Sequence, residues 1–146
     1  MEARVRNSFV RQGYMATLDA EVVHVAAGEV DIALPFSERL TQQDGYLHAG
    51  VVAGLMDSAC GYAALTTMDS DAEVLTVEFK INLLAPATGV RLVARGRVLR
   101  PGRTLTVCRG DAFTINDGQE THVATLTATM IARFARPPGR DTTNPS

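Results

Sequence analysis

A long run of small apolar residues in the middle of the chain constrains its fold more than any other segment. Between residues 48 and 68 the apolar side chains recur with the period of an α-helix. This helix is unusually rich in glycine and alanine, and glycine lowers helix propensity. We therefore expect the helix to approach a surrounding sheet or a ligand closely. The apolar positions that set the period are Val51, Leu55 and Ala59, together with Val52, Met56 and Ala63.

Segments with β-strand patterns flank this helix on both sides. Residues 20–26 and 29–34 precede it, and Ala27-Gly28 forms a turn signal between them. Four longer β candidates follow the helix, at residues 74–84, 90–100, 104–115 and 120–134. One helix with six strands predicts an α+β fold, in which a strongly curved antiparallel sheet wraps around the central helix.

The last four β candidates have the pattern of an antiparallel meander with one face in water. In residues 90–100, three arginines share one alternation phase and apolar residues share the other. The arginines are Arg91, Arg95 and Arg97, and the apolar residues are Leu92, Ala94 and Val98. Residues 100–103 and 116–118 are predicted hairpin loops.

The chain divides into three parts by composition. We expect residues 1–19 to form an N-terminal segment with a short helix over residues 5–15. Residues 20–134 carry the strand and helix patterns and are expected to form one domain. Residues 135–146 are rich in proline and are expected to be a disordered tail.

The composition argues against several classes of function. The formal net charge is −2, so we expect no general attraction to nucleic acid or to anionic membranes. No apolar run has the length of a membrane span, and the N-terminus lacks the apolar stretch of a signal peptide. Because Cys60 and Cys108 are isolated, we expect reduced thiols and a cytoplasmic location. Metal-ligand and dinucleotide motifs are absent from the sequence, so we expect neither a metal nor a redox cofactor.

The loop that leads into the helix, residues 42–50, combines polar residues, glycines and a histidine. The first turn of a helix presents unpaired N–H donors and the positive end of the helix dipole. These groups stabilise negative charge, including the charge on a carbonyl oxygen under nucleophilic attack. About two turns later Asp57 stands alone among apolar residues, where a carboxylate must be paired, solvated or functional.

Three segments occur in an order that is typical of one family. The first runs from Gln42 through His48-Ala49-Gly50 to Asp57, nine positions after the histidine. The second is the strand at residues 76–86, and the third is the turn at residues 100–105. Together they resemble the hotdog-fold acyl-CoA thioesterases of the phenylacetate-pathway (PaaI) type, over roughly residues 20–133. The family's His-Gly-Gly reads His-Ala-Gly here, and alanine keeps the N–H that the family directs at the thioester oxygen.

This resemblance implies the roles of individual residues. Asp57 would be the general base or nucleophile, and the N–H groups of Ala49 and Gly50 would form the oxyanion hole. The other catalytic candidates are His48 and Gln42, which would orient the thioester, and Thr76, which would position the attacking water. The substrate-binding candidates are Gly45, Asn82, Gly102, Arg103 and Thr104. The implied partner is an acyl-CoA, and the implied assembly is a homo-oligomer, a dimer of dimers, whose neighbouring subunits complete each site.

Each candidate also has an ordinary structural explanation. Asp57 could lie on a solvated helix face, and Thr76 could reflect strand propensity alone. Arg103 could be a solvated hairpin arginine, and Cys60 is expected in core packing. Two alternative functions stay open from the sequence. One is a non-catalytic acyl-CoA-binding hotdog protein, and the other is a hotdog hydratase or dehydratase.

Overall fold

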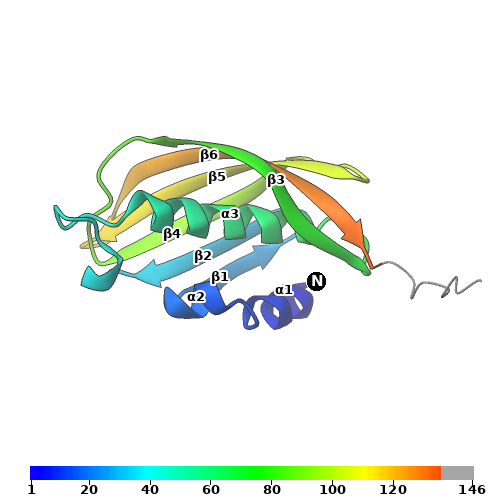
Figure 1. The fold of residues 1–146 in the computed structure, drawn as a ribbon, viewed down its shortest axis with the longest axis horizontal. Helices are drawn as coiled ribbons and strands as arrows, with labels where there is room; N and C mark the ends of the chain where they lie inside the picture. The colour runs from blue at the N-terminus through cyan, green and yellow to red at the C-terminus, as the bar shows by residue number, and fades with distance from the viewer. Residues whose placement is uncertain (136–146) are drawn as a thin grey trace, which may run out of the picture.

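The computed structural model describes residues 1–135, and it confirms the predicted fold class. Six antiparallel strands form one curved sheet in the order β1-β2-β4-β5-β6-β3, with helix α3 on its concave face (Figure 1). The strands are β1 (Glu21–Ala26), β2 (Glu29–Pro35), β3 (Ala72–Leu83), β4 (Arg91–Arg100), β5 (Leu105–Asn116) and β6 (Gln119–Phe134). The helices are α1 (Glu2–Phe9), α2 (Gly13–Thr17), the 3-10 helix η1 (Glu38–Leu40) and α3 (Ala49–Leu65). Within residues 1–135, none of the helices combines the length and the apolar character of a membrane span.

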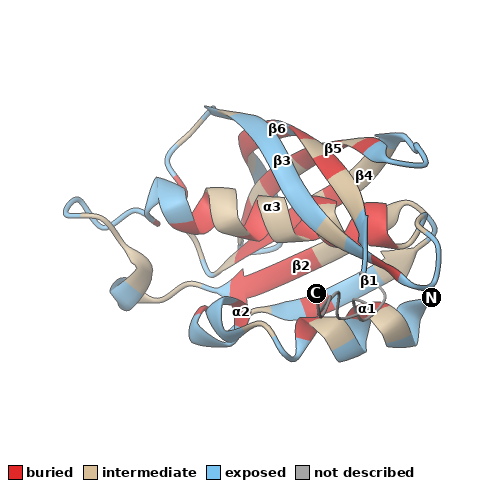
Figure 2. Ribbon diagram, turned by 45° about the vertical axis from the view of Figure 1, so that its right-hand side comes forward, coloured by how far each residue is buried: buried red, intermediate tan, exposed pale blue. Residues whose placement is uncertain are grey.

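The core lies between α3 and the sheet. The helix face that carries Leu55, Met56 and Ala59 is fully buried, whereas most of β3 is exposed (Figure 2). The close approach between helix and sheet depends on a glycine of the sheet. A Cβ atom at Gly96 would collide with the backbone carbonyl of Ala59. The expected close approach of helix and sheet is therefore found, but β4 supplies the glycine that permits it.

The predicted helix over residues 5–15 is wrong, because the segment forms two helices with a break between them. Gln12 is extended, with φ −80° and ψ 106°, and it caps α2. The break lets Phe9 and Met15 both enter the core. In one continuous helix these two residues would point in directions about 120° apart, because each residue turns the helix by about 100°.

The predicted four-strand meander is correct only for β4, β5 and β6. Strand β3 pairs with β6 at the far edge of the sheet and is not adjacent to β4. Seven residues, 84–90, connect β3 to β4 across the end of the sheet. Adjacent antiparallel strands are usually joined by a much shorter turn, so the length of this connection agrees with the separation of the two strands. The predicted hairpin at residues 116–118 is confirmed. Asp117 and Gly118 both have positive φ, at 49° and 73°, as a two-residue turn of this kind requires.

Candidate active site

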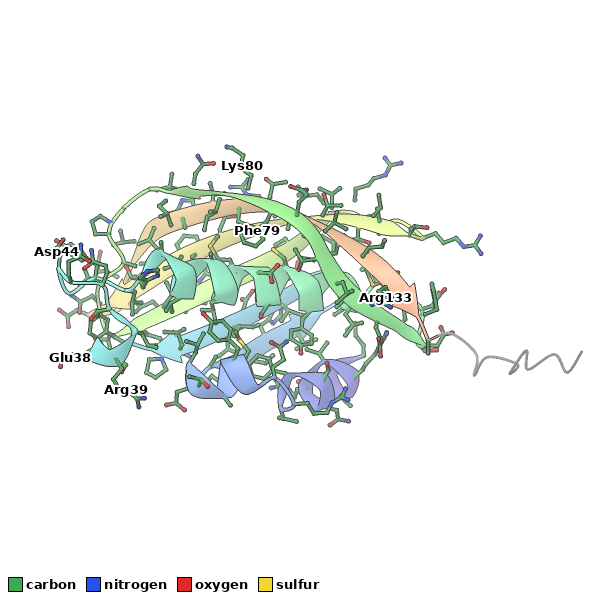
Figure 3. The ribbon with its side chains drawn as sticks, viewed as in Figure 1. Glu38, Arg39, Asp44, Phe79, Lys80 and Arg133 are labelled. Carbon is green, nitrogen blue, oxygen red and sulfur yellow. The ribbon has the colours of Figure 1, made fainter. Side chains whose placement is uncertain are left out.

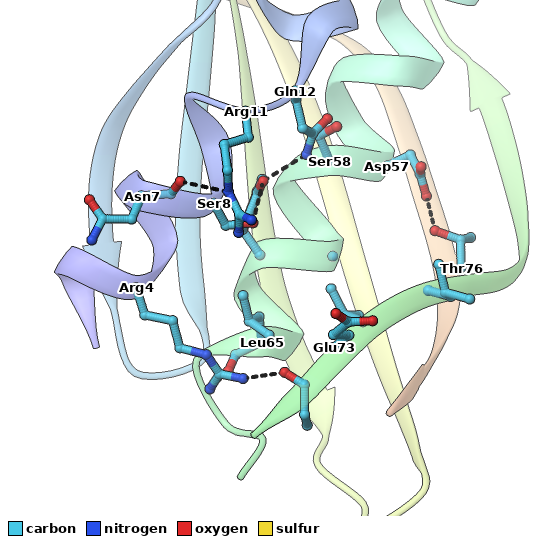
Figure 4. A pocket seen from close by; sticks show the side chains of 15 residues that line it. Arg4, Asn7, Ser8, Arg11, Gln12, Asp57, Ser58, Leu65, Glu73 and Thr76 are labelled. Carbon is cyan, nitrogen blue, oxygen red and sulfur yellow. Dashed lines mark hydrogen bonds between the residues drawn. The ribbon is translucent and has the colours of Figure 1, made fainter. Parts of the chain in front are cut away.

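The Asp57 carboxylate on α3 accepts a hydrogen bond from the Thr76 hydroxyl on β3. The distance from Thr76 Oγ1 to Asp57 Oδ1 is 2.7 Å (Figure 4). Burial raises the pKa of Asp57 above its ordinary value, and the hydrogen bond from Thr76 partly opposes this shift. The structure therefore brings together two residues that lie 19 positions apart in the sequence. The carboxylate is partly buried, and one of its oxygens is held in place.

A β-bulge in β3 directs Thr76 at the helix. The register with β6 shifts between Thr76 and Glu78, so Thr76 is opposite Met130 and Phe79 is opposite Ala128. Both β6 partners are fully buried and face the core. Phe79 points toward α3 and Lys80 points away from it (Figure 3). The alternation pattern of the sequence did not predict this bulge, which adds one residue between the two inward positions.

The helix begins with a cap that uses one of the proposed oxyanion donors. His48 is the N-cap of α3, and its Nδ1 atom accepts a hydrogen bond of 2.8 Å from the Gly50 N–H. The Ala49 N–H has no acceptor among the residues that the structure describes. Of the two candidate donors, Ala49 is therefore the one that is available to a ligand. The His48 backbone is fixed as well, because its N–H donates to the Leu40 carbonyl at 2.9 Å.

The loop before the helix is a tight turn held by Gln42. The Gln42 N–H donates to the Tyr46 carbonyl at 2.8 Å, and the Gln42 side-chain oxygen accepts a bond from the Asp44 N–H. Gly45 has a φ of +85°, which glycine adopts readily, so the turn accounts for this residue. Gln42 and Ala49 line a pocket of about 410 Å³, whose other walls come from the end of β3 and the residues after it.

Asp57 and the Ala49 N–H lie in separate pockets of one chain. The two residues are eight positions apart, which corresponds to about 12 Å along the helix axis. Asp57 and Thr76 line a different pocket, of about 620 Å³, which faces α1. Within one chain, the two groups of candidate residues therefore do not meet.

The remaining substrate-binding candidates lie away from Asp57. Gly102 and Arg103 line a pocket of about 400 Å³ beside the C-terminal end of α3. Gly102 has a structural explanation, because a Cβ atom there would collide with the Leu105 carbonyl. The Thr104 carbonyl accepts a hydrogen bond of 2.9 Å from the Ala132 N–H. Asn82 follows Lys80 on the outer face of β3, and the Lys80 ammonium donates to its side-chain oxygen at 2.9 Å.

The two cysteines are packed in the core, as expected for Cys60. Both are fully buried, and burial raises the pKa of each thiol, that of Cys108 to about 12. Neither thiol is therefore ionised near neutral pH, so neither has the character of a nucleophile. Within residues 1–135 no group of three or more potential ligands is arranged to hold a metal ion.

Sequence reasoning missed the side chains of α1 that face Asp57. The pocket beside Asp57 is lined by α1 and the residues just after it. These residues are Arg4, Asn7, Ser8, Arg11 and Gln12. Nothing in their local pattern marks them, because they are ordinary polar residues of an amphipathic helix.

The chain is similar to proteins of one superfamily. A family model described as "Thioesterase superfamily" matches residues 44–121. A relative from Saccharolobus solfataricus, named as a putative esterase, is 37% identical over 90 residues, which cover 62% of this chain and 64% of the relative. The 1,4-dihydroxy-2-naphthoyl-CoA hydrolase of Listeria monocytogenes is 28% identical over 95 residues, 65% of this chain and 77% of that protein.

Solved structures agree with these matches. A thioesterase family protein from Silicibacter pomeroyi is 50% identical, with a TM-score of 0.88, over 90% of this chain and 96% of the other. The PaaI protein of E. coli, from the phenylacetic acid degradation operon, is 16% identical, with a TM-score of 0.77 over 86% and 88% of the two chains. At 16% identity, the similarity to the E. coli PaaI protein shows a shared fold and nothing more.

Proposed function

Because the chain belongs to the thioesterase superfamily, we propose that it hydrolyses acyl-CoA thioesters to a free acid and CoA. The observation that carries this proposal is the partly buried Asp57 carboxylate, held by Thr76 at the end of a pocket. A pKa raised by burial makes the carboxylate a stronger base, and a general base works best when its pKa approaches the working pH.

In the proposed reaction, Asp57 takes a proton from a water molecule as the water oxygen attacks the thioester carbon. The carbonyl oxygen becomes negatively charged and accepts a hydrogen bond from the Ala49 N–H at the positive end of α3. When the tetrahedral intermediate collapses, the C–S bond breaks. The CoA thiolate then takes the proton from Asp57, which regenerates the carboxylate. In the alternative route, the Asp57 carboxylate attacks the thioester carbon itself and the CoA thiolate leaves as the C–S bond breaks. Water then hydrolyses the resulting mixed anhydride, which releases the free acid and regenerates the carboxylate.

The proposed site requires two subunits. Asp57 and the Ala49 N–H of one chain are about 12 Å apart along the helix, too far for both to act on one carbonyl group. Strand β3 is an edge strand, and four of its apolar side chains are between 41% and 54% exposed. These side chains are Leu75, Val77, Phe79 and Leu83. An open apolar edge of this kind favours pairing with a second copy of the chain. We therefore propose a homodimer in which Asp57 of one protomer faces Ala49 of its partner, with dimers pairing into a dimer of dimers.

A thiol-release assay over aryl, short-chain, medium-chain and long-chain acyl-CoAs tests this function. We expect Asp57→Asn to lower kcat by about 100-fold or more on the best substrate, the scale of a lost general base. The matched control is Asp71→Asn, which changes an exposed aspartate outside the pocket. Circular dichroism and sedimentation should show that both variants keep the fold and the assembly.

Two outcomes would contradict the proposal. If Asp57→Asn releases thiol at the wild-type rate, Asp57 is not the catalytic group. If the wild-type protein binds acyl-CoAs saturably and releases no thiol, the chain is a binding protein.

A further inference from the structure

A groove of about 620 Å³ runs along α3 away from Asp57 (Figure 4). Its floor is the helix face from Asp57 through Gly61 to Leu65, which corresponds to about 12 Å of helix. One wall is the first half of β3, residues 72–76, and the other wall is α1 with the residues that follow it. The proposed catalytic carboxylate therefore lies at one end of a long groove.

Arg4 connects α1 by hydrogen bonds to the end of the groove that is farthest from Asp57. Its guanidinium donates to the carbonyls of Leu65 and Met68, each at 3.3 Å, and to the carbonyl of Ala72. These three carbonyls belong to the end of α3, the loop after it and the start of β3. The hydrogen bonds of Arg4 thus hold these three segments together at the closed end of the groove.

A second set of contacts holds the wall near its middle. The Gln12 amide donates to the Tyr62 hydroxyl at 2.7 Å, and Ser8 Oγ lies 3.2 Å from the same oxygen. The Phe9 ring packs against the Tyr62 ring with a centroid distance of 5.9 Å. Tyr62 is only 4% exposed, so the wall is part of the folded core.

The floor of the groove is open at Gly61. Apart from its chain neighbours and the adjacent backbone of α3, no atom of residues 1–135 lies within 4 Å of the position that a Cβ atom would occupy there. Gly54 on the same helix differs, because the Tyr14 ring fills the space beside it, 2.7 Å from the position of its missing Cβ. Glycine is a poorer helix former than alanine, and the contacts of Gly61 within this chain do not require it. The space above Gly61 is continuous with the groove that begins at Asp57.

We propose that this groove holds the acyl group of the thioester, and that Gly61 sets the size of the acyl group that fits. This inference rests on the proposed function. The thioester carbon must lie beside Asp57, and the acyl group is bonded directly to that carbon, so it enters the space next to the carboxylate. Part of the lining is apolar, with Leu65 on α3 and Ala72, Val74 and Leu75 on β3, and this part suits an aryl or medium-chain acyl group. The rest of the lining is polar and includes Glu73 on β3. The polar side chains Asn7 and Arg11 lie along the α1 wall.

The test compares Gly61→Leu with Gly61→Ala. Leucine is a good helix former, so the helix is kept while the side chain fills the groove. We expect Gly61→Leu to lower kcat/KM for aryl-CoA and medium-chain acyl-CoA at least about tenfold relative to acetyl-CoA, since a few methylene groups alter discrimination by this amount. Gly61→Ala adds one methyl group to the same space, so it should shift the preference in the same direction by a smaller factor, and it should raise the melting temperature because alanine is the better helix former.

Other outcomes overturn the inference. An equal loss on acetyl-CoA and on the larger substrates means that Gly61 does not select the acyl group. Dissociation of the Gly61→Leu oligomer in sedimentation means that a second copy of the chain fills the space. If the wild-type protein releases no thiol from any acyl-CoA, the proposed function is wrong as well. If the wild-type protein is active and Gly61→Leu affects all substrates equally, only the inference about Gly61 is wrong.

Discussion

At the scale of single residues, two opposing effects set the state of Asp57. Burial raises its pKa, and the hydrogen bond from Thr76 favours the ionised form and opposes the shift. Because the pKa in the folded state is above its unfolded value, ionising this group opposes folding. The contribution of Asp57 to stability is therefore full below its unfolded pKa, and it is lost as the pH rises through the raised folded value. Such a stability cost is common where a carboxylate is kept for chemistry.

We predict that Thr76→Val moves the acidic limb of the pH–rate profile to higher pH. Hydrolysis requires the ionised carboxylate, so kcat/KM falls as the pH drops through the pKa of Asp57. Valine has nearly the shape of threonine but donates no hydrogen bond, so burial raises the pKa of Asp57 without opposition. Thr76→Ser keeps the hydroxyl and should keep the wild-type profile. An unchanged limb in Thr76→Val would show that Thr76 does not tune the group that titrates.

At the scale of elements, β3 and the β4–β5 hairpin position different candidate residues. The bulge in β3 directs Thr76 at α3, and the outer edge of the strand stays unpaired within the chain. The hairpin at residues 101–104 places Arg103 beside the C-terminal end of α3, in a pocket apart from Asp57. Arg103 has no carboxylate partner among residues 1–135, and a guanidinium is suited to phosphate groups. We therefore propose that this hairpin contacts the nucleotide of CoA.

We predict that Arg103→Ala raises KM for the acyl-CoA and leaves kcat nearly unchanged. The contact lies far from the reacting carbon, so it stabilises the ground state and the transition state equally. The increase should shrink at high salt, because the contact is exposed and screened. Arg103→Lys, which keeps the charge, should lose less. If a truncated thioester without the nucleotide suffers equally from Arg103→Ala, Arg103 does not bind the nucleotide.

At the scale of the whole molecule, one chain carries the proposed site residues in two separate groups. Asp57 and Thr76 lie in the groove beside α1, while Gln42 and Ala49 lie at the start of α3. In the proposed homodimer, a second copy of the chain brings the complementary groups together across the β3 edge. Such an isologous dimer contains two equivalent sites, each with one half from each protomer.

Mixed oligomers of two inactive variants test this arrangement. Ala49→Pro removes the unpaired N–H at the first helical position, where proline is favoured. His48 has φ −60° and ψ 138°, the extended backbone that a following proline requires, so the helix start is kept. Alone, this variant should lose about 100- to 1,000-fold in kcat, the cost of one oxyanion donor. Co-expressed with Asp57→Asn, it should recover about one quarter of wild-type activity, since half of random dimers contain one intact site.

Two results would contradict the shared site. A mixture that stays as inactive as its parents indicates that Asp57 and Ala49 act within one chain. A wild-type protein that sediments as a monomer and keeps full activity at nanomolar concentration leads to the same conclusion.

The local sequence was enough to predict the six strands, the central helix and the main candidate residues. The helix period, the strand alternation and the turn at Asp117-Gly118 are local patterns, and they predicted the fold class and nearly all of the strands. The lone carboxylate of Asp57, with the resemblance of its surroundings to one family, made it the leading candidate. These properties can be read from neighbouring residues because backbone geometry links positions one to four apart.

Which distant segments meet depends on the packing of the whole fold. The pairing of β3 with β6, the bulge beneath Thr76 and the wall that α1 places beside Asp57 all join residues far apart in the sequence. The same holds for the capping of the Gly50 N–H by His48, which depends on how the loop enters the helix. Such contacts form when the sheet curves around α3. Several strands have similar local patterns, so packing and strand register determine which of them pair. For this reason the sequence could name Asp57 and Ala49 as candidates, and only the fold could place them in separate pockets.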